Sequence, residues 1–514
     1  MTDKLRPILS RGTPRDSAKA FCTWNRPNLI RQQQDWLDWN GRAYDVIEDD
    51  TIRADIAAWL DTAFEEYMDE SSGKKNRRFK PKPTDVSSIY SSLESLVHKR
   101  ADTFSPPCWL DAAANRPDPL DLISCESGLV DMRTRKLYKH TPAFFTLNSI
   151  PLVYDPTAPR PKLWLKCLDQ WFECNAGLIA LLQELFGYTL SGDTSQHVAP
   201  FLWGVPRGGK STVLRVLTDL VGRANTHSPS IKELSGRFGL WGCLGKSLIT
   251  ITDMDIDSRT EIGNAATSIK AITGEDMISV ERKNKDPWAG LMAGRIWLAA
   301  NGLPDFGSHA SAICTRVRVL PFFVSFLGRE DRDLTNRRGT GKLQMELPGI
   351  LNWALDGLDR LRENGRFTEC IESESAKNRM LYQSQPIRGM VEDLCELRAD
   401  VHIDKAVLYS VYVTYCNGAG ERPISSNKFA EKLLEIYSVV GSSRRSIKGS
   451  EHRPPIFAGI RLKEREAMKM YRIATEYTIH DIEPGLGIDF WAIAARDDDG
   501  EPILRDDVHA DFGP

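Results

Sequence analysis

A short loop of small residues that ends in a lysine and a serine has the composition needed to hold a phosphate group. Residues 204–211 read GVPRGGKS and match the pattern GxxxxGK[ST] in full. In this pattern glycines let backbone N–H groups curl around the phosphates, the lysine reaches the β- and γ-phosphates, and the serine hydroxyl ligates Mg²⁺. We therefore expect ATP and Mg²⁺ at this loop, with these contact residues: Gly204, Val205, Pro206, Arg207, Gly208, Gly209, Lys210, Ser211 and Thr212.

Acidic residues are expected where a neighbouring strand ends. The apolar, β-branched run 246–252 is followed by Asp253, with Asp255 two residues later. A carboxylate at the C-terminal tip of such a strand holds Mg²⁺ or orients the attacking water. Asp253 is the first candidate for this metal and catalytic role, and Asp255 is the second. Because Thr252 stands where a glutamate is usual, the sequence leaves the general base unassigned.

Two further polar groups border the next apolar runs. Asn301 ends the run 295–301, and its amide is a candidate to hydrogen-bond the γ-phosphate or the attacking water. Arg316 precedes the run 317–322, which contains Arg318. An arginine at this edge is either an arginine finger for ATP bound by a neighbouring copy or part of a surface ion pair. Arg316 is our candidate for the finger.

These groups need a sheet and helices to position them. An apolar run at 198–203 predicts a strand before the loop, and STVLRVLTDLVG predicts a helix that ends at Gly222. The runs 246–252, 295–301 and 317–322 are expected as further strands. We therefore predict an α/β P-loop core, AAA+-like in type, over residues 196–330.

The N-terminal part of the chain shows helical patterns. Apolar residues at helical spacing near 49–69 and 85–99 predict two helices, so we expect a helical region over 1–115. The strongly basic segment 74–82 between them is expected to be an exposed loop, either solvated or in contact with nucleic acid.

The remaining segments differ in pattern. Residues 116–195 hold short strands and turns followed by a helical stretch at 163–190. Residues 331–385 are expected to be helical. Residues 386–470 predict two helices and a basic ribbon, a winged-helix-like arrangement, and residues 471–514 form a tail of unassigned role.

Composition limits the classes of protein that fit. The 514 residues are enough for three or four domains, and 41% hydrophobic and 27% charged residues are ordinary for a globular chain. A net charge of −3 means that DNA contacts must come from local basic patches. Ten cysteines without CxxC spacing indicate neither a zinc ribbon nor a redox pair. With no signal peptide and no apolar run of about 18 residues, we expect a cytoplasmic protein without a membrane partner.

The order of these blocks resembles superfamily 3 helicases. Between the acidic residues and Asn301 stands IKAITGED, which is similar to the family block iK-x-(l/i)-T-G-x-D and begins at Ile269. The family patterns N-x-x-P and R-x-R-x-x-P-F are matched from Asn301 and from Arg316. Segments 128–159 and 411–435 are similar to the helicase-associated N-terminal region and the winged-helix tail. The nearest resemblance is to phage- and plasmid-encoded primase–helicase proteins and their poxvirus-type NTPase relatives.

This resemblance implies an ATP-driven DNA helicase that works as a homo-hexameric ring in the replication of a phage, plasmid or related element. It also implies a hairpin at 278–288 that grips single-stranded DNA in the ring channel, through these residues: Arg282, Lys283, Asn284 and Lys285. The winged-helix module is a candidate for duplex binding or protein contact.

The sequence departs from the family in three places. The family often has glutamate at the position of Asp253 and two adjacent arginines where Thr315 and Arg316 stand. Residues 1–115 are too few for the polymerase-like domain of primase-bearing relatives and contain no Asp-x-Asp pair. We therefore expect no primer synthesis by this chain and consider a separate primase as a partner.

Two other functions remain open on sequence alone. One is a P-loop motor for nucleic-acid packaging or helicase loading, and the other is a DNA-binding regulator whose nucleotide state switches its assembly. Neither would separate the strands of a forked DNA, so strand displacement discriminates them from a helicase.

Overall fold

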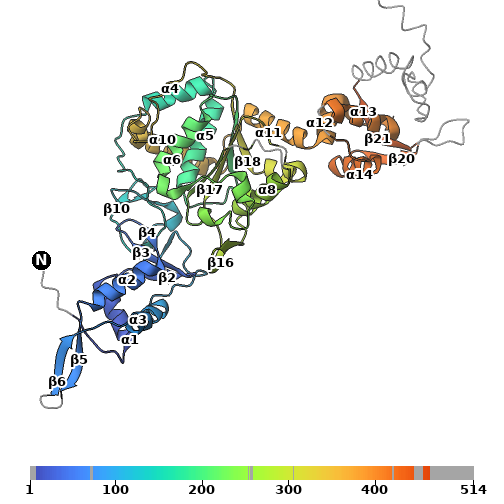
Figure 1. Cartoon of the computed structure of the whole chain (residues 1–514). Helices are drawn as coiled ribbons and strands as arrows, with labels where there is room; N and C mark the ends of the chain where they lie inside the picture. Colours follow the sequence, from blue (N-terminus) through green and yellow to red (C-terminus); the bar gives the residue numbers. More distant parts are fainter. Residues whose placement is uncertain are drawn as a thin grey trace, which may run out of the picture. The chain divides into compact units, whose positions relative to one another are not determined.

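The computed structural model describes residues 7–69, 73–252, 254, 259–304, 306–418, 422–444 and 455–463. They form two compact units, one up to Asn378 and one from Arg379 (Figure 1). The sequence had placed this boundary at 385/386, a few residues later. No helix in the described parts of the chain has the length and apolarity needed to cross a membrane.

A five-stranded sheet forms the centre of the first unit, in the order β13-β14-β17-β12-β18. Every neighbouring pair is parallel. The central strands are apolar and buried along nearly their whole length, as expected for a parallel sheet covered on both faces. The four strands expected around the phosphate loop are confirmed. The bounds are β12 Ala199–Gly204, β13 Thr226–His227, β14 Leu248–Thr252, β17 Arg295–Ala300 and β18 Val317–Phe322.

Helices pack on this sheet through one large apolar core. The helix α6 (Lys210–Val221) follows β12 and ends at Gly222, as predicted. The stretch expected to be helical at 163–190 is two helices, α4 (Lys162–Trp171) and α5 (Ala176–Leu190). The helix α10 (Leu347–Asn364) lies against α5 so closely that a Cβ on Gly187 would come within 2.2 Å of the Ala354 carbonyl oxygen.

Three further helices and a hairpin complete the core. The helices are α7 (Ile231–Leu234), α8 (Arg259–Thr273) and α9 (Ala310–Cys314). The antiparallel strands β15 (Ile278–Arg282) and β16 (Lys285–Gly290) form the hairpin that the sequence predicted at 278–288. The helix α11 (Ile371–Ser384) follows α10, so the prediction of helices over 331–385 holds from 347 onward.

The N-terminal region is mixed rather than helical, which corrects the expectation for 1–115. Its helices are α1 (Pro14–Trp24), α2 (Asp49–Leu60) and α3 (Pro83–Leu96). They accompany two three-stranded sheets, β1-β5-β6 and β2-β3-β4. The strand bounds are β1 Ile8–Leu9, β2 Ile30–Gln32, β3 Asp35–Trp39, β4 Tyr44–Ile47, β5 Phe64–Asp69 and β6 Gly73–Arg78.

The helix predicted at 49–69 ends at Leu60, and the chain then forms β5. Phe64 donates its backbone N–H to Pro7 O over 2.9 Å, which joins β5 to the N-terminal strand β1. The basic segment expected to be a loop supplies β6, where Arg77 faces Glu65 across the ladder with Nε 2.7 Å from Oε1. Opposite charges on facing strand positions stabilise the pairing. The helical spacing of apolar residues between Leu60 and residue 69 is therefore a coincidence.

Short strands follow this region, as expected for the part of 116–195 that precedes the helical stretch. Two small antiparallel sheets have the orders β10-β9-β8 and β11-β7. The bounds are β7 Cys108–Trp109, β8 Leu122–Ser124, β9 Leu129–Asp131, β10 Leu137–Tyr138 and β11 Phe144–Phe145.

The second unit contains helices around a three-stranded antiparallel sheet of order β19-β21-β20. The two predicted helices are α13 (Lys405–Gly418) and α14 (Ser426–Ile436), and Ser425 is the N-cap residue of α14. The other elements are α12 Pro386–Leu394, β19 Cys395–Asp404, β20 Gly441–Arg444 and β21 Pro455–Leu462. The ribbon residues 445–454 and the tail 471–514 lie outside the described residues.

Candidate functional site

The loop between β12 and α6 requires glycine at both of its ends. Gly204 ends β12 at φ +140°, and a Cβ there would lie 2.0 Å from the Phe322 carbonyl oxygen of β18. Gly209 is the N-cap of α6 at φ +109°, and a Cβ there would lie 2.7 Å from the Trp171 ring. Since no larger residue fits either space, the loop is held closely between β18 and α4.

The end of β18 and the residues that follow it form hydrogen bonds with the backbone of this loop. Val205 donates its N–H to Phe322 O (2.9 Å), and Phe326 donates to Arg207 O (3.1 Å). The Ser325 hydroxyl donates to Pro206 O over 3.0 Å. These bonds hold the loop backbone in place, and no pattern in the sequence predicted them.

The structure brings two of the predicted residues into direct contact. The Lys210 ammonium donates to Asn301 Oδ1 over 3.0 Å, and also to the carbonyl oxygens of Gly204 (2.6 Å) and Val205 (2.8 Å). Lys210 is only 8% exposed. A positive charge is therefore held inside the loop, beside a neutral amide that follows β17.

The first turn of α6 supplies the remaining loop residues. Ser211 is exposed and Thr212 is half-buried, whereas Gly208, which precedes the helix within the loop, is buried. Gly209 has no side chain with which to cap α6, so the partial positive charge at this helix N-terminus remains available to an anion. This geometry suits a phosphate group.

The ends of three strands meet at the edge of the sheet where the loop lies. Trp203 of β12 is in register with Ala300 of β17, and Ala299 is in register with Thr252, the last residue of β14. Asp253 and Asp255, the predicted acidic residues, lie outside the described residues. In the described part of the chain, no three His, Cys, Asp or Glu side chains are grouped as a metal site would require.

Arg316 lies at the other end of the sheet. Ala199, the first residue of β12, donates its N–H to Arg316 O, and β12 runs parallel to β18 from there to Gly204. Five residue steps of about 3.3 Å separate that start from the loop. Arg316 donates Nη1 to Ala312 O (3.0 Å), and its buried Nε has no hydrogen-bond partner among the described residues.

Arg318 and Lys270 have local partners. Burial lowers the pKa of the Arg318 guanidinium, although Glu374 and Glu369 nearby favour its charged form. In the block similar to the superfamily 3 pattern, Lys270 Nζ lies 3.1 Å from His309 Nδ1. His309 was missed from sequence because nothing in its own segment marks it as a partner of α8.

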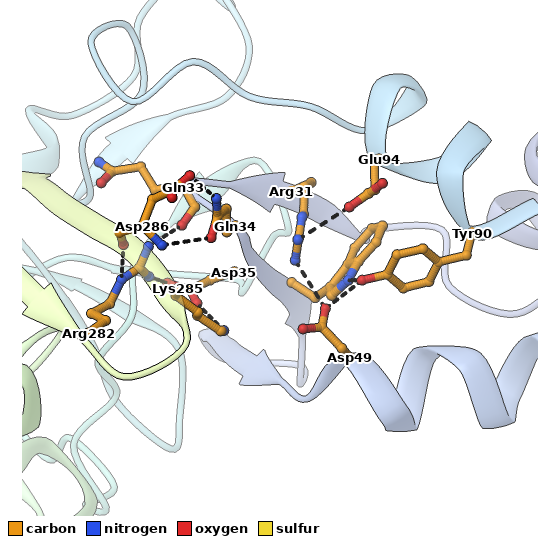
Figure 2. Close-up of polar contacts among 11 residues, drawn as sticks. Arg31, Gln33, Gln34, Asp35, Asp49, Tyr90, Glu94, Arg282, Lys285 and Asp286 are labelled. Carbon is orange, nitrogen blue, oxygen red and sulfur yellow. Dashed lines mark hydrogen bonds and ion pairs between the residues drawn. The ribbon is translucent and has the colours of Figure 1, made fainter. Parts of the chain in front are cut away.

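The predicted DNA-binding residues of the hairpin divide into two pairs. Lys283 and Asn284 lie exposed at its tip, where Asn284 has φ +61°. Arg282 and Lys285 instead contact Asp35 of β3, at 2.9 Å and 2.8 Å (Figure 2). The Asp35 contact was also missed, because its partners are about 250 positions away in the sequence.

Two family models match parts of the chain. Residues 18–173 match the model described as D5 N terminal like, and residues 202–316 match a family of unknown function, DUF5906. The first match relates the chain to the primase–helicase family, whose N-terminal region that model describes.

Solved structures of the C-terminal region of NrS-1 are similar to this chain. One apo structure, the A form, has 12% sequence identity and a TM-score of 0.47 over 89% of this chain and 100% of the other. A second apo structure has 12% identity and a TM-score of 0.47 over 87% and 99%. A further A-form structure has 11% identity and a TM-score of 0.44.

Proposed function

We propose that this chain is an ATP-dependent DNA helicase that acts as a ring in the replication of a phage, plasmid or related mobile element. The observation that carries the proposal is the Lys210 amine, held inside a glycine loop in contact with Asn301. The motif order supports a helicase of superfamily 3. The D5 N-terminal match agrees with that choice because it relates the chain to primase–helicase proteins.

The loop residues fit a nucleotide triphosphate. Gly204 and Gly209 leave room for close backbone approach, and α6 presents its uncapped N-terminus. Lys210 would move from the loop carbonyls to the β- and γ-phosphates, and Ser211 would hold Mg²⁺, which neutralises charge on the phosphates. The Asn301 amide would then donate a hydrogen bond to the γ-phosphate or bind the attacking water. Asp253, with Asp255 as second choice, remains the proposed acidic partner.

The position of Arg316 supports action between copies. Since Arg316 lies about 16 Å along the sheet from the loop of its own chain, an arginine side chain cannot span that distance. It can reach only ATP bound by a neighbour. A ring of identical copies, with the hexamer as the expected size, satisfies this geometry.

Two parts of the chain are proposed to contact DNA. The exposed tip of the β15–β16 hairpin, with Lys283 and Asn284, would contact the phosphates of a single strand in the ring channel. The second unit has the element order helix, strand, helix, helix, strand, strand, which suits a winged helix. Duplex binding is proposed for that unit, and a separate primase remains a candidate partner.

The first test is ATP hydrolysis with and without single-stranded DNA. Phosphate release that rises with DNA and disappears in Lys210→Ala supports the proposal. A wild-type rate of hydrolysis in folded Lys210→Ala would remove the loop from the mechanism. A packaging motor, helicase loader or regulator would also hydrolyse ATP, so strand displacement must then separate these alternatives.

A further inference from the structure

The turn between β2 and β3 in the N-terminal region docks on the β15–β16 hairpin of the core. Figure 2 shows Gln33, Gln34 and Asp35 pointing toward Arg282, Lys285 and Asp286, which lie on the hairpin. The contacts join residues about 250 positions apart in the sequence. The same hairpin is the proposed DNA contact, so the turn lies against the surface that DNA would use.

The two glutamine side chains bond to the free edge of β16. Gln33 donates Nε2 to Ala289 O (2.8 Å) and accepts the Ala289 N–H at Oε1 (3.0 Å). Gln34 accepts the Asp286 N–H (3.1 Å) and donates to the Asp286 carboxylate. Within the described residues β16 pairs only with β15, so these amides take the place of a further strand at its other edge.

The turn adopts an unfavourable backbone conformation that allows these bonds. Gln33 and Gln34 have φ values of +46° and +67°, in the left-handed region that asparagine and glycine normally occupy in two-residue hairpin turns. Each such residue costs of order 1 kcal/mol, and the cost persists only where surrounding contacts compensate for it. Here the bonds to Asp286 and Ala289 are those contacts.

The Asp35 carboxylate binds both inner cations of the hairpin. It accepts from Arg282 Nη1 (2.9 Å) and from Lys285 Nζ (2.8 Å). Arg282 also donates to Gln33 O (2.8 Å) and to Asp286 O (2.9 Å), and its side chain is 2% exposed. An oxyanion that accepts from one arginine and one lysine is the contact that a DNA phosphate would make with the same residues.

A polar network behind the turn anchors it. Asp49 of α2 accepts from the Tyr90 hydroxyl (2.6 Å) and from Arg31 of β2 (3.4 Å). Burial acts to raise the pKa of Asp49, but the Tyr90 hydrogen bond and the charges of Arg31 and Lys285 hold that pKa below its usual value. Asp49 is therefore ionised at neutral pH and adds a second negative charge near Lys285.

From these contacts we infer that Asp35 acts as an internal phosphate mimic, which latches the hairpin until single-stranded nucleic acid displaces it. The inference rests on the proposed function for the role of the hairpin. Lys283 and Asn284 are exposed at the tip and meet the strand first. The phosphate backbone then competes with Asp35 for Arg282 and Lys285, and the N-terminal turn leaves the edge of β16. Full DNA contact thus requires release of the N-terminal region.

A matched pair of variants tests the latch. Asp35→Asn removes the charge that holds the hairpin, and Asp38→Asn removes an equal charge from the same strand. Asp38 is 18% exposed against 23% for Asp35 and pairs with Arg26 at 2.5 Å, so the control removes a carboxylate of similar exposure that also binds an arginine but not the hairpin. Binding of a fluorescein-labelled oligothymidylate is followed by anisotropy over a salt series, on the full chain and without ATP.

The latch predicts that Asp35→Asn binds the oligonucleotide about tenfold more tightly than wild type at low salt. The plot of log affinity against log salt should steepen by roughly 0.7 to 1.4, because one or two further phosphates are contacted. Asp38→Asn should bind within about twofold of wild type, since it leaves the latch intact. The inference is overturned if Asp35→Asn binds no more tightly than wild type, or if Asp38→Asn gains as much affinity as Asp35→Asn. Weaker binding by Asp35→Asn would mean that the turn holds the hairpin in the conformation that binds DNA.

A second variant covers the case in which Asp35→Asn fails to fold. Gln34→Gly removes the bonds to Asp286, and glycine adopts the φ of +67° without strain. The affinity of Gln34→Gly for the oligonucleotide should also rise, but by less than that of Asp35→Asn. An unchanged affinity would contradict the latch. These assays measure binding alone. If Asp35→Asn binds more tightly but the protein does not separate strands, the latch is supported and the helicase function is rejected. If the protein separates strands but Asp35→Asn binds no more tightly, the helicase function is supported and the latch is rejected.

Discussion

Lys210 and Asn301 lie 91 positions apart in the sequence, yet the lysine amine donates to the asparagine amide oxygen over 3.0 Å. The pairing follows from the sheet, in which β12 and β17 are adjacent and parallel, so that the residues beyond their ends share one edge. A phosphate that draws Lys210 away from the loop would break this bond. Under the proposed function, the contacts of Asn301 would therefore change when a nucleotide binds.

Asn301→Ala should bind nucleotide but hydrolyse it on the order of a hundredfold more slowly. The expected loss is that of one hydrogen-bonding group at the reacting phosphate. Binding of a fluorescent ADP analogue and steady-state phosphate release separate the two effects. Asn352→Ala is the control, since the half-buried Asn352 amide donates to Asp155 O and belongs to none of the nucleotide motifs. Unchanged hydrolysis in Asn301→Ala would show that the amide has no part in the reaction.

Gly204→Ala should destabilise the core strongly. Its Cβ would lie 2.0 Å from Phe322 O, so the backbone of β12 or β18 must move. We expect a loss of about 3 kcal/mol or more in the free energy of unfolding, together with loss of nucleotide binding. Gly365→Ala is the matched control, because φ is +67° there and nothing lies within 4 Å of the added Cβ.

The control should cost about 1 kcal/mol, the penalty of the left-handed backbone alone. Thermal melts of both variants give the comparison. Equal melting temperatures in Gly204→Ala and Gly365→Ala would mean that the loop does not pack against β18 as described.

Arg316→Ala should bind ATP and hydrolyse it roughly a thousandfold more slowly or worse. Mixing it with Lys210→Ala should restore activity, because the intact loop of one subunit then meets the arginine of the other. Phosphate release is measured across mixing ratios, with mixed assemblies verified by size-exclusion chromatography. If mixed rings form and no ratio recovers hydrolysis, Arg316 does not act between subunits.

Lys283→Ala should lower the ratio of ATP hydrolysis with single-stranded DNA to hydrolysis without it. Lys283 is exposed at the hairpin tip, where one phosphate contact is lost whatever the base sequence. The salt dependence of binding should flatten by about 0.7 in slope. The exposed Lys166 of α4 gives the control Lys166→Ala, for which DNA stimulation should match wild type. The same stimulation ratio in both variants would mean that DNA does not pass the hairpin tip.

The central sheet could be predicted because its strands are buried on both faces. The run 198–203 is apolar over its whole length, and the run 295–301 is apolar between Arg295 and Asn301. Turn residues separate these runs, so the positions of the strands along the chain could be predicted. Lys210 and Asn301 were found for the same reason, since each follows one of these runs. The sequence could not give the order of the strands in the sheet or the closeness of the two residues.

Contacts between distant segments were not predictable. Nothing around Arg282 and Lys285 indicates that Asp35 binds both, because each of the three lies at a strand end beside an ordinary polar turn. The end of α2 was also missed, since the apolar spacing runs on beyond Leu60 while the backbone joins β1. In both cases a contact between distant segments, and not the local sequence, decided the structure.

Strand displacement from a forked DNA tests the proposed function most directly. A fluorophore and quencher at the fork report separation of the strands by wild type and by Lys210→Ala, with ATP and Mg²⁺ or with ADP. The account predicts separation by wild type with ATP only, and none by folded Lys210→Ala. ATP hydrolysis by wild type without strand separation, under conditions where the ring and the fork are both bound, would contradict it.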